Sequence, residues 1–407
     1  ELAGQASNFL PNMGSAQEVA VDFSSGTADQ ATGGVRINII PREGGNEFTG
    51  SLFATGANSH FQGDNYTEDL QARGLRTPNS VKMNYDVNPT IGGPLERDKV
   101  WFYGAARWTK TQNFVGGMFH NVNEGVENIW TYTADLDRPA VVNSFQRSVN
   151  LRLTWQANPK NKFSVFVDDQ GRCQCAIVNA TTAPEAAIEI KYPVQRMSTL
   201  SWTAPQTNRL LLEARAGFRR ENYKYNAMDA SDPRKRLITV TEQGSVGGAP
   251  AGLQYHGGGI GGATATQPYQ NTDGRNYDVV FAASYITGTH ALKVGASDTI
   301  VLRDESLDDN VFHTSYRFNN TIPNQITQRS TPYTKAQRQP VGIGLYAQDK
   351  WTIDQFTFNV GVRFDYLKIR IPAQHLDPAP HVPRRNLDLP ETEKPELTGP
   401  TMALMSR

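Results

Sequence analysis

The chain has 407 residues, of which 38% are hydrophobic and 20% are charged. Lysine and arginine together number 40, as do aspartate and glutamate, so the formal net charge is zero. That balance argues against a nucleic-acid binder, whose phosphate contacts need a basic surface, and we expect no nucleic-acid partner. The longest apolar run found is 279–283, far short of the ~20 residues that a membrane-spanning helix needs.

The composition nevertheless fits strands that cross a membrane. Such a strand needs about ten residues, with an apolar side chain at every second one. Long polar loops between the strands would lower the mean hydropathy to the observed −0.51. The chain opens without a basic segment and an apolar core, so we expect an exported protein whose sequence here begins downstream of its export signal.

The first 46 residues differ from the rest. Glu18–Phe23 and Gly34–Ile40 are short strand-like segments joined by Ser-, Gly-, Thr- and Ala-rich sequence. They predict a small globular piece that leads directly into a first long strand near residues 47–56.

Residues 47–371 carry recurring strands of alternating polarity. In 356–366 one face carries Phe356, Phe358, Val360, Val362, Phe364 and Tyr366, and the other face is polar. This period of two predicts a strand, because a helix would spread these side chains around its circumference. Noisier versions run through 149–155, 163–168, 210–219 and 341–348.

Short and long connections alternate between these segments. Tight turns are expected at 95–98, 158–161, 205–208, 287–289 and 354–355, and long polar stretches at 57–82, 112–146, 174–190, 226–274 and 305–338. Bacterial outer-membrane barrels have short turns at one rim and long loops at the other. We therefore predict an all-β fold, a transmembrane antiparallel β-barrel of which this chain supplies about twelve strands.

Aromatic side chains gather beside the short turns: Trp101, Phe102, Tyr103, Trp155, Phe163, Trp202, Trp351 and Phe356. An aromatic girdle at a membrane interface predicts this placement, because the ring is apolar while its edge tolerates headgroups. Aromatic packing at the ends of a soluble sandwich is the alternative. After residue 371 the alternation stops among many prolines and charges, and we expect 372–407 to be an irregular tail.

Few residues carry recognisable chemistry. Cys173 and Cys175 are the only cysteines; a local loop disulfide is favoured over free thiols, and a zinc site would need about four ligands. We expect no metal, no cofactor, no catalytic residue and no enzyme activity, since the histidines form no metal motif and no nucleophile elbow is present. The arginines on the polar strand faces either line a ligand path or, as we favour, are paired or solvated: Arg152, Arg215, Arg219 and Arg363.

Four stretches resemble a known family. Residues 31–53 resemble the plug-to-barrel junction of TonB-dependent receptors, most of all the Oar-like subgroup, with a Gly-Gly strand, a Gly-Asn-Glu-Phe turn and a Gly-Ser-Leu-Phe strand in succession. Residues 92–103 resemble the family's first periplasmic turn, and the two stretches 344–351 and 361–365 are similar to a hairpin near mid-barrel. The resemblance extends over about residues 16–370, and its motifs occur in the family's order.

The resemblance implies a 22-stranded barrel plugged by an N-terminal domain, which imports a scarce ligand with energy passed through TonB. Residues 1–46 would be the C-terminal part of the plug, and 47–371 the N-terminal half of the barrel. The implied partners are outer-membrane lipid, an extracellular ligand that the sequence does not identify, and the TonB complex, reached through an upstream region absent here. A porin-like passive channel and a soluble secreted β-rich binding protein remain the alternatives.

Overall fold

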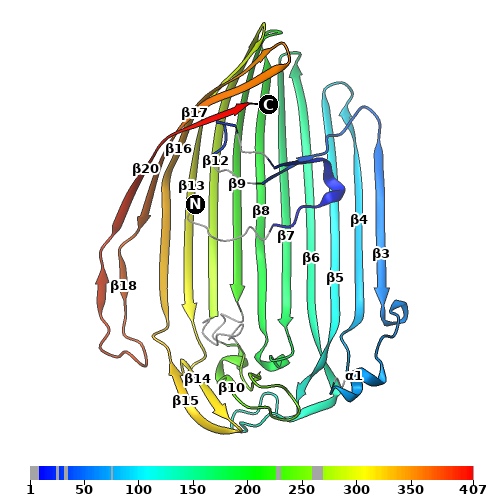
Figure 1. Cartoon of the computed structure of the whole chain (residues 1–407), viewed down its shortest axis with the longest axis vertical. Helices are drawn as coiled ribbons and strands as arrows, with labels where there is room; N and C mark the ends of the chain where they lie inside the picture. Colours follow the sequence, from blue (N-terminus) through cyan, green and yellow to red (C-terminus); the bar gives the residue numbers. More distant parts are fainter. Residues whose placement is uncertain are drawn as a thin grey trace.

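The computed structural model describes residues 9–23, 27–31, 35–74, 77–225, 231–258 and 269–406. Within them, twelve strands form one antiparallel sheet in which each strand pairs with the next strand of the sheet along the chain (Figure 1). The strands are β3 (Thr49–Asn58), β4 (Ser80–Glu96), β5 (Val100–Asn121), β6 (Ala134–Asn158), β7 (Asn161–Ile177), β8 (Ile188–Pro205), β9 (Leu210–Tyr225), β12 (Tyr269–Thr287), β13 (His290–Asp308), β16 (Tyr333–Ile353), β17 (Phe356–Ile371) and β20 (Thr392–Ser406). Strands β3 and β20 are the two edges, so the expected twelve-stranded, incomplete barrel is confirmed.

The alternation of short and long connections is also confirmed. The short turns lie at one end of the sheet, and the long connections, with the small strands β10, β14 and β15, lie at the other (Figure 1). The tight turns use residues that tolerate positive φ, among them Asp98, Gly288 and Asp354 at +61°, +55° and +47°. Several strands run further into the long connections than expected, as when β5 continues to Asn121.

The apolar face of the sheet points outward. In β6 Val149, Leu151 and Leu153 are 53%, 44% and 39% exposed, whereas Asn150 and Thr154 on the other face are 4% and 1% exposed. A soluble sandwich would bury the first set and expose the second. The soluble alternative is therefore wrong, and the apolar band fits lipid as its surroundings.

Aromatic rings line the short-turn end of this outer face. Trp155 stacks on Phe163 with ring centroids 5.6 Å apart, and Trp351 lies 6.2 Å from Phe358. The girdle expectation fails for Trp101 and Tyr103. They sit opposite Thr154 and Arg152 of β6, on the inner face, because neighbouring strand residues alternate between faces and only Phe102 of that trio points outward.

The residues before β3 form a separate antiparallel hairpin, which we call the N-terminal segment (the described residues of 9–46). It contains η1 (Met13–Ser15), β1 (Ala16–Asp22) and β2 (Arg36–Pro41), close to the two strands expected there. The segment bonds to β4–β7 through one part and to β13, β16 and β17 through another, and so lies across the concave face (Figure 1).

The expectation of an irregular tail from residue 372 is wrong for much of its length. Strands β18 (Gln374–Leu376) and β19 (Leu387–Leu389) form a small hairpin, and β20 pairs with β17. β17 offers a row of unpaired backbone groups that an extended segment can satisfy. The prolines of β20 are compatible with this role because β20 is an edge strand.

Candidate ligand-binding site

The long connections fold together into a cap at one end of the sheet. Strands β10 (Val240–Glu242), β11 (Gln254–Tyr255), β14 (Thr314–Asn319) and β15 (Ile322–Gln328) form a second sheet, in which β10 and β14 are parallel. The cap also contains η3 (Pro184–Ala186) and η4 (Pro233–Arg236), while η2 (Ser59–Phe61) and α1 (Glu68–Ala72) lie in the β3–β4 connection. No helix among the described residues is long and apolar enough to cross a membrane.

The cap has a hydrophobic core of its own. Its buried members come from the ends of strands and from four connections: Met118, Tyr132, Ala140, Val178, Ala183, Ala187, Val240, Ala249, Leu253, Tyr255 and Phe318. Ordering long loops costs conformational entropy, which this burial offsets. The cap therefore holds a defined shape, although in the sequence the same stretches are recognisable only as long and polar.

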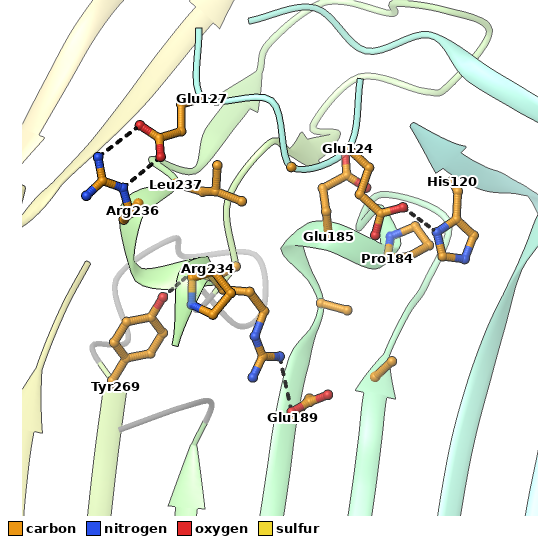
Figure 2. Close-up of a pocket in the computed structure, with 15 residues that line it drawn as sticks. His120, Glu124, Glu127, Pro184, Glu185, Glu189, Arg234, Arg236, Leu237 and Tyr269 are labelled. Carbon is orange, nitrogen blue, oxygen red and sulfur yellow. Dashed lines mark hydrogen bonds and ion pairs between the residues drawn. The ribbon is translucent and has the colours of Figure 1, made fainter. Parts of the chain in front are cut away.

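A cavity of about 440 Å³ opens between the connections of the cap (Figure 2). Its charged lining comes from three separate connections and from the β8 strand: Glu124, Glu127, Glu185, Glu189, Arg234 and Arg236. The volume lies in the range of small-molecule sites, which are about 300–1,000 Å³. None of these residues was singled out from the sequence, because no spacing links positions that only the folded cap brings together.

Three of the four glutamates have cationic partners. Glu127 accepts a 2.7 Å hydrogen bond from Arg236, and Glu189 lies 3.2 Å from Arg234 (Figure 2). Glu124 is bound by His120 at 2.9 Å and by Arg138 at 2.7 Å. Burial would raise the pKa of Glu124, but these two partners together lower it, so Glu124 is ionised at neutral pH.

Glu185 differs from the other three. It is 8% exposed, its Oε1 accepts a 3.3 Å hydrogen bond from the backbone N–H of His256, and its Oε2 has no hydrogen-bond partner among the described residues. Burial raises the pKa of Glu185, against the hydrogen bonds from His256 and from the Asn121 side chain. A buried carboxylate without a cation is costly, which marks the residue as more than a packing element.

We expect Glu185→Gln to stabilise the cap at pH 7 by about 1 kcal/mol, since it removes a buried charge without changing shape. Burial raises the folded pKa of Glu185 above the ordinary glutamate value of 4.5, so above that pH the folded cap binds more protons than the unfolded chain. Its stability therefore falls as pH rises from 4.5 through the folded pKa. Hydrogen exchange of cap amides should show the gain at pH 7 and none below pH 4.5; a destabilised variant at pH 7 would contradict it.

The inward arginines are held in different ways. Arg152 donates to Glu43 and to the carbonyl of Pro41, both in the N-terminal segment, and Arg363 pairs with Asp365 and reaches the Ala28 carbonyl. Arg215 lies 3.9 Å from Asp278 and remains largely exposed, and Arg219 sits opposite Asn276. The paired interpretation holds for Arg152 and Arg363.

Cys173 and Cys175 lie in β7 rather than in a loop, and the structure joins them as a disulfide directly before Ala176, which lines the cavity. The oxidised state in the cell stays a prediction. We expect unreduced protein to take up no maleimide, reduced protein to take up two, and Cys173→Ser to take up one without reduction. Labelling of unreduced wild-type protein would contradict the predicted disulfide.

The described residues contain no group of three or more His, Cys, Asp or Glu that suits a metal ion.

An outward apolar band, an aromatic rim and unequal loops define an outer-membrane β-barrel protein. The chain belongs to the family described as outer membrane beta barrel domain, whose family model matches residues 119–375. Over 86 residues, which are 21% of this chain and 8% of the other, it is 34% identical to the TonB-dependent transporter Oar of Myxococcus xanthus. The protein is thus located in the bacterial outer membrane, and the resemblance to TonB-dependent receptors is confirmed.

Solved structures share the fold. The ferric yersiniabactin uptake receptor FyuA from Yersinia pestis aligns with a TM-score of 0.58 at 12% identity, over 96% of this chain and 49% of that one. The outer membrane transporter YddB from Escherichia coli aligns with a TM-score of 0.56 at 12% identity, over 88% and 45%. The chain therefore spans about half the length of the structures it matches.

Proposed function

We propose that this chain is part of a TonB-dependent outer-membrane receptor that imports a ligand, with residues 1–46 as the end of its plug. In this proposal residues 47–371, extended by β20, form about half of the barrel wall. The ligand enters through the cap. The TonB complex acts through a region upstream of this chain. No step of this process needs bond chemistry, so we propose no enzyme activity.

The observation that carries the proposal is the way the N-terminal segment meets the wall. Glu43 bridges Arg152 of β6 and Lys162 of β7, the latter at 2.7 Å. Asp29 accepts a 2.7 Å hydrogen bond from Lys293 of β13, and its backbone N–H donates to Gln348 of β16 at 3.2 Å. The contacts are polar, so water can replace them when the segment moves.

Close approach of the backbone to the wall supports the same idea. A Cβ on Gly44 would come within 2.2 Å of the Phe102 carbonyl oxygen, so glycine lets the chain run flat along β5. The hydrogen bonds of Lys293 and Thr27 outweigh the burial of Asp29 and lower its pKa, so this contact is ionic at neutral pH. A plug that blocks the pore at rest and yields to force would be attached in this manner.

The test is the permeability of cells that carry the complete gene product. Wild-type protein should exclude vancomycin. A Glu43→Gln, Asp29→Asn double variant should raise susceptibility by about fivefold, the change in population that about 1 kcal/mol produces. Glu18→Gln, an exposed carboxylate on the same segment, is the control and should behave as wild type.

Two outcomes would contradict the proposal. If wild-type protein already admits vancomycin, the barrel is a passive channel. If the double variant is present in wild-type amount in the outer membrane and susceptibility is unchanged, the segment is not the barrier.

A further inference from the structure

We propose that the cavity of the cap binds a small organic cation, whose charged group is held by Glu185. The inference deepens the proposed function, because it assigns a chemical class to the imported ligand or to part of it. It rests on the charge of the lining, on one unsatisfied oxygen, and on the size and polarity of the space.

The lining has an excess of negative charge. Four glutamates and two arginines face the cavity, and both arginines are already engaged, Arg236 by Glu127 and Arg234 by Glu189 and Asp232. Glu124 is engaged by His120 and by Arg138. The remaining carboxylate is Glu185, for which no ion pair is recorded among the described residues, so an anionic ligand would meet no free cation on this lining.

The hydrogen bonds around the Glu185 carboxylate leave room for a partner supplied by a ligand. Oε1 of Glu185 accepts from the His256 backbone N–H, the Asn121 side chain lies beside the carboxyl group, and Oε2 is buried without a hydrogen bond of good geometry to described residues. The His256 ring is not available to it, since Nδ1 lies 2.8 Å from the Ile238 carbonyl and Nε2 lies 3.1 Å from the Val126 carbonyl. An ammonium or guanidinium N–H from a ligand would satisfy Oε2 and balance the charge.

The rest of the space suits an organic body rather than a bare ion. Pro184, Ala187 and Leu237 contribute apolar surface beside the charged groups (Figure 2 labels Pro184 and Leu237). Ca²⁺ takes about six to eight oxygen ligands, and one free carboxylate oxygen falls far short of that. A cation with a short aliphatic chain would fill the volume and cover these apolar groups.

Calorimetric titration of the purified complete gene product in detergent tests the proposal. The probes are cadaverine, the neutral 1,5-pentanediol and the anionic glutarate, which share a five-carbon chain. We expect binding of cadaverine and none of the other two. Glu185→Gln should weaken cadaverine binding by at least about tenfold, the factor expected for a charge-assisted hydrogen bond. Glu68→Gln, an exposed glutamate of the β3–β4 connection outside the cavity, should leave affinity within about threefold.

Glu185→Asp keeps the charge but shortens the side chain by one methylene. Its affinity for cadaverine should lie between those of wild type and Glu185→Gln. This second variant keeps the proposal testable if Glu185→Gln does not fold. Equal affinity for cadaverine and the diol, or no loss in both Glu185 variants, would overturn the proposal. Binding of Ca²⁺ that requires Glu185 would overturn it as well, in favour of a metal. The readout needs no transport, so failed import with intact cadaverine binding would count against the proposed function alone.

Discussion

Val279→Arg is expected to destabilise the membrane-embedded fold by about 2–4 kcal/mol, the cost of arginine on the lipid face near the middle of a bilayer. Val279 lies near the middle of β12, is 57% exposed, and points to the apolar outer face. The guanidinium of an arginine at position 279 would have to reach the headgroups from the middle of the bilayer. Unfolding of the complete gene product in lipid vesicles by guanidinium chloride would measure the loss of stability. Heat-modifiable mobility on gels would check that the barrel is folded.

The matched control is Thr199→Arg, which introduces the same side chain at the same level on the inner face. Thr199 is directly opposite Gly217, which in turn is opposite Asp278, the residue before Val279. The Asp278 carboxylate covers Gly217, so an arginine at position 199 would have an anion and water beside it. We expect a change below about 1 kcal/mol. An equal loss at both positions would show that the outer face is not in lipid.

The contrast between these two faces was readable from the sequence because a strand places alternate residues on opposite sides without reference to anything distant. The pattern in 356–366 therefore predicted which side chains are exposed, and the turns and long connections followed from composition. The sequence did not show which of the three aromatic residues 101–103 faces outward, because a run of aromatic residues has no alternation of polar and apolar side chains. Strand β20 was missed for another reason: its partner is the free edge of β17, and edge pairing tolerates the prolines that usually end a strand.

The candidate site was beyond sequence reasoning. Glu185 lies within the stretch 174–190, which composition describes only as polar and loop-like. Glu185 lacks an ion-pair partner because His120, Arg138, Arg234 and Arg236 pair with other carboxylates, and these four residues come from β5, β6 and the β9–β12 connection. Such a constellation exists only after the cap has folded, so the stability of the cap decides whether the site exists.

Leu253→Ala provides that test, with an expected loss of about 2–5 kcal/mol of cap stability, as for other fully buried leucines. Leu253 is 0% exposed in the cap core. Neighbouring backbone hydrogen bonds tie separate parts of the cap together, from Glu242 to Leu253 at 2.8 Å and from Gln254 to Thr181 at 2.8 Å. Hydrogen exchange at these amides should accelerate while the amides of β6, β7 and β8 keep their protection, because the sheet has its own hydrogen-bond ladder.

Ile322→Ala is the control for the same measurement. It also truncates an aliphatic residue of the cap, but Ile322 is 67% exposed, so the change should stay within about 0.5 kcal/mol. If Leu253→Ala leaves exchange at Glu242 and Gln254 unchanged, the cap is not a cooperative unit and cannot hold the cavity open. If exchange accelerates there and cadaverine affinity falls in proportion, the loops act as a folded binding module whose stability sets the fraction of competent sites.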